Sequence, residues 1–455
     1  MEKLMEINGI INGFVWGPPM LILLVGTGIY LTFRTNFMSL GKLAYILKST
    51  LLKMFKKEQK GEGEVTAFQA VATALAATVG TGNIAGVATA IATGGPGAVF
   101  WMWFSAIFGM TTKFGEVVLS IKYREKTPDG RFVGGPMYYI SNGLKWKWLA
   151  YIFAAFGALA AFGIGNMVQS NSVAASLEVS FGINKLVAGI VMAVLTAIVI
   201  IGGLKRIAQV TEILVPFMAA FYILGGLFII IMNISHIGEA FGLIFGNAFT
   251  PAAAVGGFAG STVKLAMTKG IARGVFSNEA GLGSAPIAHA AATTDHPVRQ
   301  GLWGVFEVFM DTIVICSITA LSIIMTGAWS TGLTGSALTT MAFDQTIPGG
   351  GYIVSIGVML FAFSTILGWE YYGERCAEFL FGPSVIKVYR ILWIPPVVIG
   401  AIGGLNMLWD LADTLNGLMA IPNLIGVLFL SPVVIKLTKE FFSKQYVEEE
   451  KKAKA

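Results

Sequence analysis

Charged residues are scarce in this chain. Only 12% of its 455 residues are Asp, Glu, Lys or Arg, whereas a soluble globular domain carries about 25%. Hydrophobic residues make up 55% of the chain. A composition this poor in charge does not supply enough polar residues to cover a water-facing surface. It predicts an all-α polytopic membrane protein.

Residues that form disulfides, metal sites or catalytic centres are also few. The two cysteines, Cys316 and Cys376, fall within apolar stretches and are expected to be buried free thiols. The three histidines lie at or beyond the ends of such stretches, and no HExxH or GxSxG motif is present. A membrane-embedded enzyme is therefore disfavoured. A passive channel is the second alternative, but it would show a continuous polar stripe or a repeated filter.

Apolar stretches long enough to cross a bilayer recur along the whole chain. A transmembrane helix needs about 20 apolar residues. The first stretch is interpreted as a span and not as a signal peptide, because it contains Pro18 and Pro19 and lacks a small-residue cleavage site. About eleven transmembrane helices are expected, at 14–33, 67–93, 97–121, 148–172, 185–203, 208–232, 253–284, 301–327, 352–379, 386–404 and 411–436.

Lysine and arginine are distributed unevenly between the connections. They crowd the 34–66 connection, every second connection after it and the tail from Lys436 to Lys454, whereas the intervening loops are nearly bare. Because cytoplasmic loops carry the excess of Lys and Arg, the N-terminus is expected outside and the C-terminus in the cytoplasm, in the plasma membrane. The net charge of +6 then reflects this asymmetry and attraction to the lipid bilayer, not nucleic-acid binding. No obligate protein partner is evident.

Glycine clusters interrupt two of the expected spans. The first cluster is Val79-Gly80-Thr81-Gly82-Asn83, and the second is Lys269-Gly270-Ile271-Ala272-Arg273-Gly274, followed by Val275 to Gly281. Each glycine costs about 1 kcal/mol in a helix interior. The clusters therefore predict broken helices that line a cavity within the protein. The alternative is that the glycines only allow helices to pack closely.

The two breaks lie five spans apart, so the helices that carry them cross the membrane in opposite directions. Interrupted spans at matching places in two halves are typical of transporters. We therefore expect an inverted five-plus-five repeat, formed by 67–232 and 233–436. An extra N-terminal helix with a basic cytoplasmic loop (1–66) precedes the repeats, and a charged cytoplasmic tail (437–455) follows them.

Longer motifs resemble a known family. The run Val79 to Asn83 resembles the unwound segment of LeuT-fold sodium symporters. The stretch Gly274 to Pro286 (GVFSNEAGLGSAP), with 134–139 and 165–172, is similar to the pattern of the alanine/glycine:cation symporter family. The resemblance covers essentially the whole chain. It implies a LeuT-like fold and sodium-coupled symport of small neutral amino acids, alanine or glycine, into the cell by alternating access.

Broken helices can bind a zwitterionic amino acid without ionised side chains. Free N–H groups at a half-helix N-terminus suit the carboxylate, and unwound carbonyls suit the ammonium. We assign these roles to the amides from Thr78 to Gly82 and the carbonyls from Ile271 to Phe276. Back-bonding hydroxyls, interhelical carboxamides and aromatic packing remain as alternatives for the side chains. The expected substrate-binding residues are Thr78, Gly80, Thr81, Gly82, Gln169, Asn171, Ile271, Gly274, Phe276, Ser277 and Trp369.

The resemblance also implies one sodium site, and the transported sodium ion is the expected cofactor. Its ligands would be the carbonyls of Ala76, Val79 and Phe361 and the hydroxyls of Ser364 and Thr365. A second sodium site is not expected, because 301–327 has no asparagine to accompany Asn83. Proton coupling is the alternative, disfavoured because the 208–232 span has no lysine to replace the ion. Partners of the charged residues within spans cannot be named from sequence.

Overall fold

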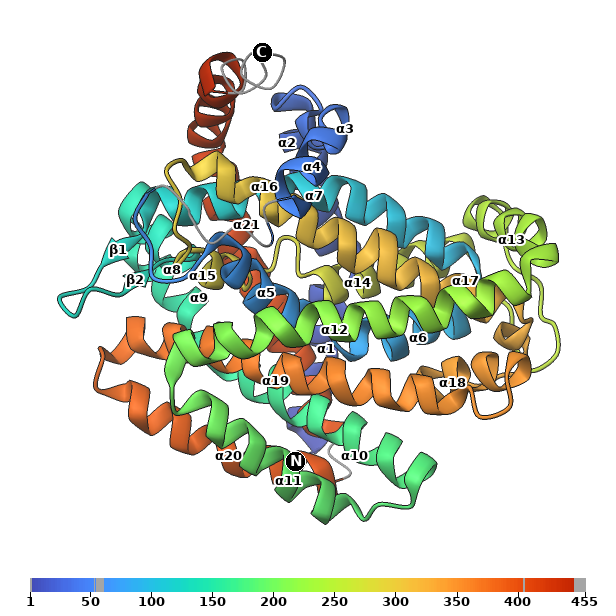
Figure 1. Ribbon diagram of the computed structural model, residues 1–455. Helices are drawn as coiled ribbons and strands as arrows, with labels where there is room; N and C mark the ends of the chain where they lie inside the picture. Colours follow the sequence, from blue (N-terminus) through green and yellow to red (C-terminus); the bar gives the residue numbers. More distant parts are fainter. Residues whose placement is uncertain (1, 53, 55–60, 404–405, 446–455) are drawn as a thin grey trace.

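The computed structural model describes residues 2–52, 54, 61–403 and 406–445. This part of the chain is almost entirely helical (Figure 1). Its strands form one short antiparallel hairpin, β1 (Glu125–Lys126) and β2 (Phe132–Val133).

The helices follow one another along the chain. In the first half they are α1 (Glu2–Val15), α2 (Pro18–Arg34), α3 (Met38–Gly41), α4 (Leu43–Leu51), α5 (Ala67–Thr78), η1 (Gly82–Gly86), α6 (Val87–Gly94), α7 (Gly97–Tyr123), α8 (Pro136–Tyr139), η2 (Ile140–Leu144), α9 (Lys147–Ala160), η3 (Ala161–Met167), α10 (Val168–Phe181), α11 (Lys185–Ile200) and α12 (Gly203–Met232). In the second half they are η4 (Ile234–His236), α13 (Ile237–Phe249), α14 (Val263–Asn278), α15 (Pro286–His289), α16 (Pro297–Val308), η5 (Phe309–Cys316), α17 (Ser317–Met325), η6 (Ala328–Ser330), α18 (Gly335–Thr346), α19 (Gly351–Phe381), α20 (Val385–Ile402), α21 (Asn406–Glu440) and η7 (Phe441–Gln445).

Many of these helices are suited to a membrane. In the described chain, eight helices are long and apolar enough to cross one, and the bent pair Ala67–Thr78 and Gly82–Gly94 makes nine. Each of the eleven predicted stretches contains a helix, but α11 and α14 have only 16 residues each. The chain is a multi-pass membrane protein, and eleven crossings stay a prediction.

The first predicted break is present. Helix α5 starts at a capping box, in which the Thr66 hydroxyl accepts from the Gln69 N–H and the Gln69 side chain accepts from the Thr66 N–H. It ends at Thr78, and Val79 leaves the helical conformation with φ −78° and ψ 89°. The chain resumes as η1 and α6 at an angle of 50°. Since Val79 is 1% exposed, the break lies inside the protein.

The second break predicted from the sequence is not at Lys269–Gly274. Helix α14 runs unbroken through Lys269–Gly274. Gly270 and Gly274 face α7 instead, where a Cβ on Gly270 would lie 2.2 Å from the carbonyl oxygen of Ala98. The glycines of this cluster therefore let α14 pack closely on α7, which was the alternative interpretation of the cluster. The helix ends at Asn278, and the turns that follow use positive φ at Glu279 (56°), Gly281 (93°) and Gly283 (83°).

The N-terminal helices pack on the outside of this arrangement. Helix α1 lies against α21, and α2 lies against α7; the indole N–H of Trp16 donates to the Asp413 carbonyl. The connection predicted as a basic loop contains α3 and α4, and its residues 53 and 55–60 lie outside the described residues, as do residues 446–455 of the predicted tail. In Figure 1 the β1–β2 hairpin projects from one side of the molecule, and α13 and α18 lie on the opposite side.

Candidate substrate and ion site

The first break meets two other helices at Gly80 and Thr81. The Gly80 N–H donates to Asn83 Oδ1 (2.9 Å), and the Thr81 N–H lies 3.4 Å from Gln169 Oε1. A Cβ on Gly80 would lie 2.5 Å from Thr365 Oγ1 and 3.5 Å from Gln169 Oε1. Glycine is therefore needed here because α19 and α10 approach the backbone closely.

Gln169 is held in place by a wide helical turn. The π-helical segment η3 precedes it, and the Gln169 amide donates to the Ile164 carbonyl at 2.9 Å. The side chain is 2% exposed. Its oxygen accepts the hydrogen bond of the Thr81 N–H. This N–H is one of the groups predicted to bind a substrate carboxylate. Gln169 thus stands at the predicted carboxylate position, and a bound carboxylate would replace this oxygen.

The last turn of α14 forms the opposite wall. A Cβ on Gly82 would lie 3.3 Å from Ser277 Cα and 3.4 Å from a ring carbon of Phe276. The Ala280 N–H donates to Asn278 Oδ1 (2.9 Å). In a continued helix it would donate to the Phe276 carbonyl, which is therefore left free. Along α14, free carbonyls are thus expected at the C-terminal end of the helix. The expected assignment of carbonyls from Ile271 onward is wrong for its first part, because those groups lie within an unbroken helix.

Four of the five expected sodium ligands converge between α5 and α19. The Ser364 hydroxyl lies 3.1 Å from the Ala76 carbonyl oxygen and 2.8 Å from that of Phe361. The Thr365 hydroxyl lies 3.1 Å and 3.0 Å from the same two oxygens. All four groups belong to buried residues. Val79, the fifth, begins the break one turn beyond Ala76. Uncharged hard oxygens of this kind fit a sodium ion.

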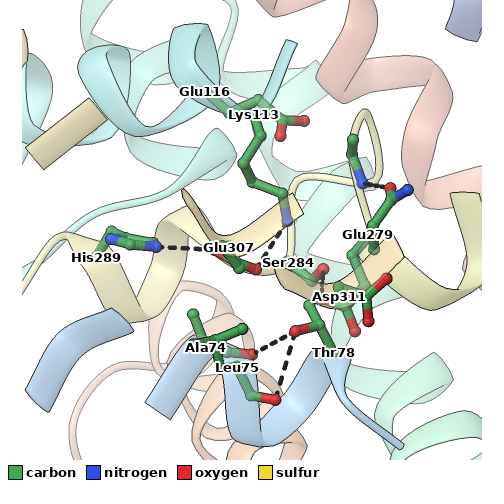
Figure 2. Close-up of polar contacts among 12 residues, drawn as sticks. Ala74, Leu75, Thr78, Lys113, Glu116, Glu279, Ser284, His289, Glu307 and Asp311 are labelled. Atoms are coloured by element: carbon green, nitrogen blue, oxygen red, sulfur yellow. Dashed lines mark hydrogen bonds and ion pairs between the residues drawn. The ribbon is translucent and has the colours of Figure 1, made fainter. Parts of the chain in front are cut away.

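Two predicted contact residues have local partners. The Thr78 hydroxyl lies 3.2 Å from the Ala74 carbonyl, one turn earlier, which is back-bonding along the helix (Figure 2). Asn171 donates to the carbonyls of Gly400, in the last turn of α20, and Gly403, just beyond its end, at 2.9 Å each. It lies two residues after Gln169 on one helix, so the two carboxamides point to different faces. The structure does not bring Asn171 to the break.

Three further predicted residues are spread around the site. Ile271 and Gly274 lie on α14 before its last turn, and a Cβ on Gly274 would meet Ser105 Oγ of α7 at 2.7 Å. These two therefore support helix packing. Trp369 lies against Gly165 of η3, where an added Cβ would be 2.1 Å from Trp369 Cβ. The indole is thus one turn of α19 beyond Thr365, at the edge of the site.

A buried polar chain connects three helices beside the site. Lys113 of α7 lies 3.2 Å from Glu307 of α16, and His289 Nε2 lies 3.0 Å from the other oxygen of Glu307 (Figure 2). Gln300 completes the chain at 2.8 Å from His289 Nδ1. Lys113, Glu307 and His289 are fully buried. Lys113 and Glu307 both fall within expected spans, but nothing in the sequence indicates that His289 joins them.

A further carboxylate reaches the first break. Asp311 of η5 lies 2.6 Å from Asn83 Nδ2 and 3.1 Å from Ser277 Oγ. The expected span 301–327 has no asparagine to accompany Asn83, but it contains Asp311, an acidic residue within an apolar stretch. The sequence signal for this contact was therefore the presence of a single aspartate within an apolar span.

Ion pairs gather towards the C-terminal end of α19, beyond Thr365. Arg131 beside β2 lies 2.8 Å from Glu378 of α19, and Arg390 of α20 lies 2.5 Å from Glu374. Arg375 also contacts both glutamates. Outside the spans, hydrogen bonds from Thr127 and Arg131 lower the pKa of Asp129 to about 2, so the hairpin end stays charged.

The residues at the predicted substrate position are buried. Thr81 is 5% exposed and Ser277 1%, so a substrate bound there would lie in the protein interior.

Comparison with known proteins agrees with this architecture. The chain matches the model of the sodium:alanine symporter family over residues 1–455. It is 54% identical over 439 residues to the sodium/alanine symporter AgcS of Methanococcus maripaludis, covering 95% of this chain and 96% of AgcS. It is 40% identical over 442 residues to the amino-acid carrier protein AlsT of Bacillus subtilis, covering 95% and 92% of the two chains.

A solved structure shows the same fold. The LeuT-fold transporter MhsT, in complex with L-phenylalanine, superposes with a TM-score of 0.54 at 13% identity, covering 83% of this chain and 99% of MhsT. The LeuT-like fold that the resemblance implies is confirmed. With a family match over its whole length, the chain belongs to the sodium:alanine symporter family.

Proposed function

We propose that this chain imports alanine, and glycine with it, by sodium-coupled symport across the plasma membrane. The observation that carries the proposal is the position of Thr365. Its hydroxyl belongs to the oxygen cluster with Ala76 and Phe361, and it also lies against Gly80 in the break. An ion at the cluster and an amino acid at the break would therefore share one backbone segment.

Coupling follows from this shared segment. A sodium ion bound by the Ala76, Phe361, Ser364 and Thr365 oxygens would fix the end of α5 against α19. That would hold Thr81 in the conformation that presents its N–H group to a carboxylate, while the Gly80 N–H stays bonded to Asn83 Oδ1. Because coupling between two ligands is reciprocal, a bound amino acid would also tighten sodium binding.

Selection for small side chains would come from the close walls. Phe276 lies against Gly82, and Gln169 takes the Thr81 N–H until a carboxylate replaces it. The ammonium would lie at the end of α14, near the free carbonyl of Phe276 and the Ser277 hydroxyl. Walls this close would favour a substrate whose side chain is a hydrogen or a methyl group.

Access would alternate between the two sides of the membrane. We assign the β1–β2 hairpin and the Arg131–Glu378 and Arg390–Glu374 pairs to the cytoplasmic side, and α13 and α18 to the outside. Opening inward would require these ion pairs to separate. The repeats 67–232 and 233–436 are the bodies proposed to move against each other, with the 1–66 and 437–455 segments outside them.

Uptake by the purified protein tests this function. Proteoliposomes should accumulate radiolabelled alanine when an inward sodium gradient is imposed, and equimolar potassium should not substitute. Accumulation driven by an inward proton gradient alone, without sodium, would instead support the proton-coupled alternative. Empty liposomes give the background.

A further inference from the structure

Glu370 is a buried carboxyl group that has neither a cationic partner nor a hydrogen-bond donor. It follows Trp369 on α19 and is fully buried. Within the described chain, neither of its oxygens accepts a hydrogen bond from an N–H or a hydroxyl group. An ionised carboxylate without a partner is strongly unfavourable in a protein interior. The surroundings of Glu370 therefore suit its neutral, protonated form.

A second carboxyl group lies within hydrogen-bonding reach of Glu370. Glu374 is one turn further along α19, on the same face of the helix, and the two carboxyl groups approach each other closely. Two ionised carboxylates cannot form a hydrogen bond, because neither has a proton to donate. Carboxyl groups this close therefore hold one proton between them.

The arginines around Glu374 decide where that proton lies. Arg390 of α20 donates to Glu374 from Nε (2.5 Å) and from Nη2 (3.1 Å), and the Arg375 guanidinium donates to it as well. Because both oxygens of Glu374 already accept from cations, Glu374 is the ionised member of the pair. Glu370 then holds the proton.

Other charged and titratable groups face the pair from neighbouring segments. Tyr389 and Arg390 lie close to Glu370 on α20, which packs along α19 (Figure 1). Further out, Glu64 before α5 and Lys205 on α12 attract each other. The ion-paired network itself is balanced without a charge on Glu370. It consists of three guanidinium groups and three carboxylates, those of Arg131, Arg375, Arg390, Asp129, Glu374 and Glu378.

A polar pocket lies between this network and the surface. Its volume is about 360 Å³, and Arg375, Arg390 and the exposed Lys387 are among the residues that line it. Glu370 does not line the pocket. Since the two arginines that bind Glu374 also line the pocket, separation of these ion pairs would admit water from the pocket to Glu370.

We propose that Glu370 is a proton-binding site that controls opening to the cytoplasm. With the ion pairs in place, Glu370 keeps its proton. When Arg390 and Glu374 separate, water reaches Glu370, the proton passes to this water, and an ionised carboxylate remains. Closing takes up a proton from the same side, so no net proton crosses the membrane. The inference rests on the proposed function, which places these ion pairs at the cytoplasmic side.

The direction of the pH effect follows from this proton count. The closed state binds one proton more than the state open to the cytoplasm. A low cytoplasmic pH therefore favours the closed state, and a high cytoplasmic pH favours opening. For one linked proton, the ratio of the two states changes by at most about tenfold per pH unit.

The test measures alanine exchange while the pH on the cytoplasmic side is varied. Right-side-out membrane vesicles contain the full chain, with sodium and alanine equal on both sides so that neither gradient drives transport. Entry of ³H-alanine is followed at fixed external pH, and vesicles without the protein give the background. We expect exchange to rise several-fold as the internal pH is raised, and an internal pH dye to report no proton flux linked to alanine.

Glu370→Gln keeps the shape of the protonated side chain but has no proton to lose. Its exchange rate should stay at every internal pH where the wild-type rate lies at low internal pH. Glu212→Gln is the matched control, because Glu212 on α12 belongs to no ion pair of the described chain. This control should keep the wild-type dependence on internal pH.

A second variant covers the case in which Glu370→Gln does not fold, as judged by size-exclusion chromatography. Glu374→Gln removes the carboxylate that keeps the proton on Glu370 and leaves Glu370 free to pair with Arg390. The dependence of exchange on internal pH should then move to lower pH by about one unit or more. An unchanged midpoint in Glu374→Gln would contradict the shared proton.

Other results overturn the inference without touching the proposed function. Wild-type exchange that ignores internal pH would leave the proton without a role, and an unchanged pH dependence in Glu370→Gln would place the proton on another group. Proton flux linked to alanine would make the proton a transported ion instead of a control on opening. Failure of the proposed function looks different, because wild-type uptake would then not depend on sodium.

Discussion

Replacing Thr365 with alanine tests the uncharged ion cluster most directly. The change removes one of four oxygens that lie within 2.8–3.1 Å of their neighbours in the cluster. The fold should survive, because Ser364 still reaches the Ala76 and Phe361 carbonyls, and alanine is a better helix former than threonine. A neutral group that contacts a charge contributes about 1.5–3 kcal/mol. Sodium affinity should therefore fall about 10- to 150-fold.

The assay follows alanine binding at increasing sodium concentrations. At fixed sodium, the Thr365→Ala protein should bind alanine more weakly, since the ion and the amino acid stabilise the same segment. High sodium should recover part of the loss by mass action. Thr365→Ser, which keeps the hydroxyl, is the matched control and should stay near the wild type. A change of Gln169 to alanine should weaken alanine binding without comparable recovery. The reasoning fails if Thr365→Ala binds alanine with the sodium dependence of the wild type.

Three further predictions address topology, substrate size and helix packing. A cysteine that replaces Lys126 in the hairpin should react with an impermeant maleimide only after the membrane is permeabilised. A cysteine that replaces Asp344 should react in intact cells. The reverse pattern would invert the proposed orientation. Glycine should compete with alanine for uptake and leucine should not, because each extra methylene in a close pocket costs about 1–3 kcal/mol; equal inhibition by leucine would contradict the cramped pocket. Gly270→Ala should lower the free energy of unfolding by about 1–3 kcal/mol, since its Cβ would enter the α7 backbone. Gly246→Ala in α13, with no neighbour within 4 Å of the added Cβ, should not lower the thermal unfolding temperature.

Features that depend on residues adjacent in the sequence were predictable from it. The break at Val79–Gly82 follows from two glycines within four residues of an apolar run, and Ser364-Thr365 is conspicuous as a pair of hydroxyls in another. Both lie where expected. That they would be in contact was implied by the family resemblance. The buried cysteines are also confirmed, because Cys316 and Cys376 are free and buried.

Features that depend on tertiary contacts were not predictable in the same way. The Gly270–Gly274 cluster has the same composition as a helix break, but the helix stays intact because close packing on α7 offsets the modest cost of each glycine. The Lys113–Glu307 pair joins residues 194 positions apart, and nothing local to either residue indicates the other. Asn171 does not reach the break for a geometric reason. It lies two residues after Gln169, and side chains two residues apart on a helix point to different faces.

The Lys113–Glu307 pair also has a consequence for how the protein is made. Helix α7 leaves the ribosome well before α16, so Lys113 must enter the bilayer while its partner is still unsynthesised. A lone lysine at the centre of a span costs about 2.5–3.5 kcal/mol during translocon insertion. The apolar residues of α7 must offset that cost, or the helix must remain beside the translocon until α16 arrives. Biogenesis should therefore be sensitive to the spacing between the two helices, even where the finished transporter is not.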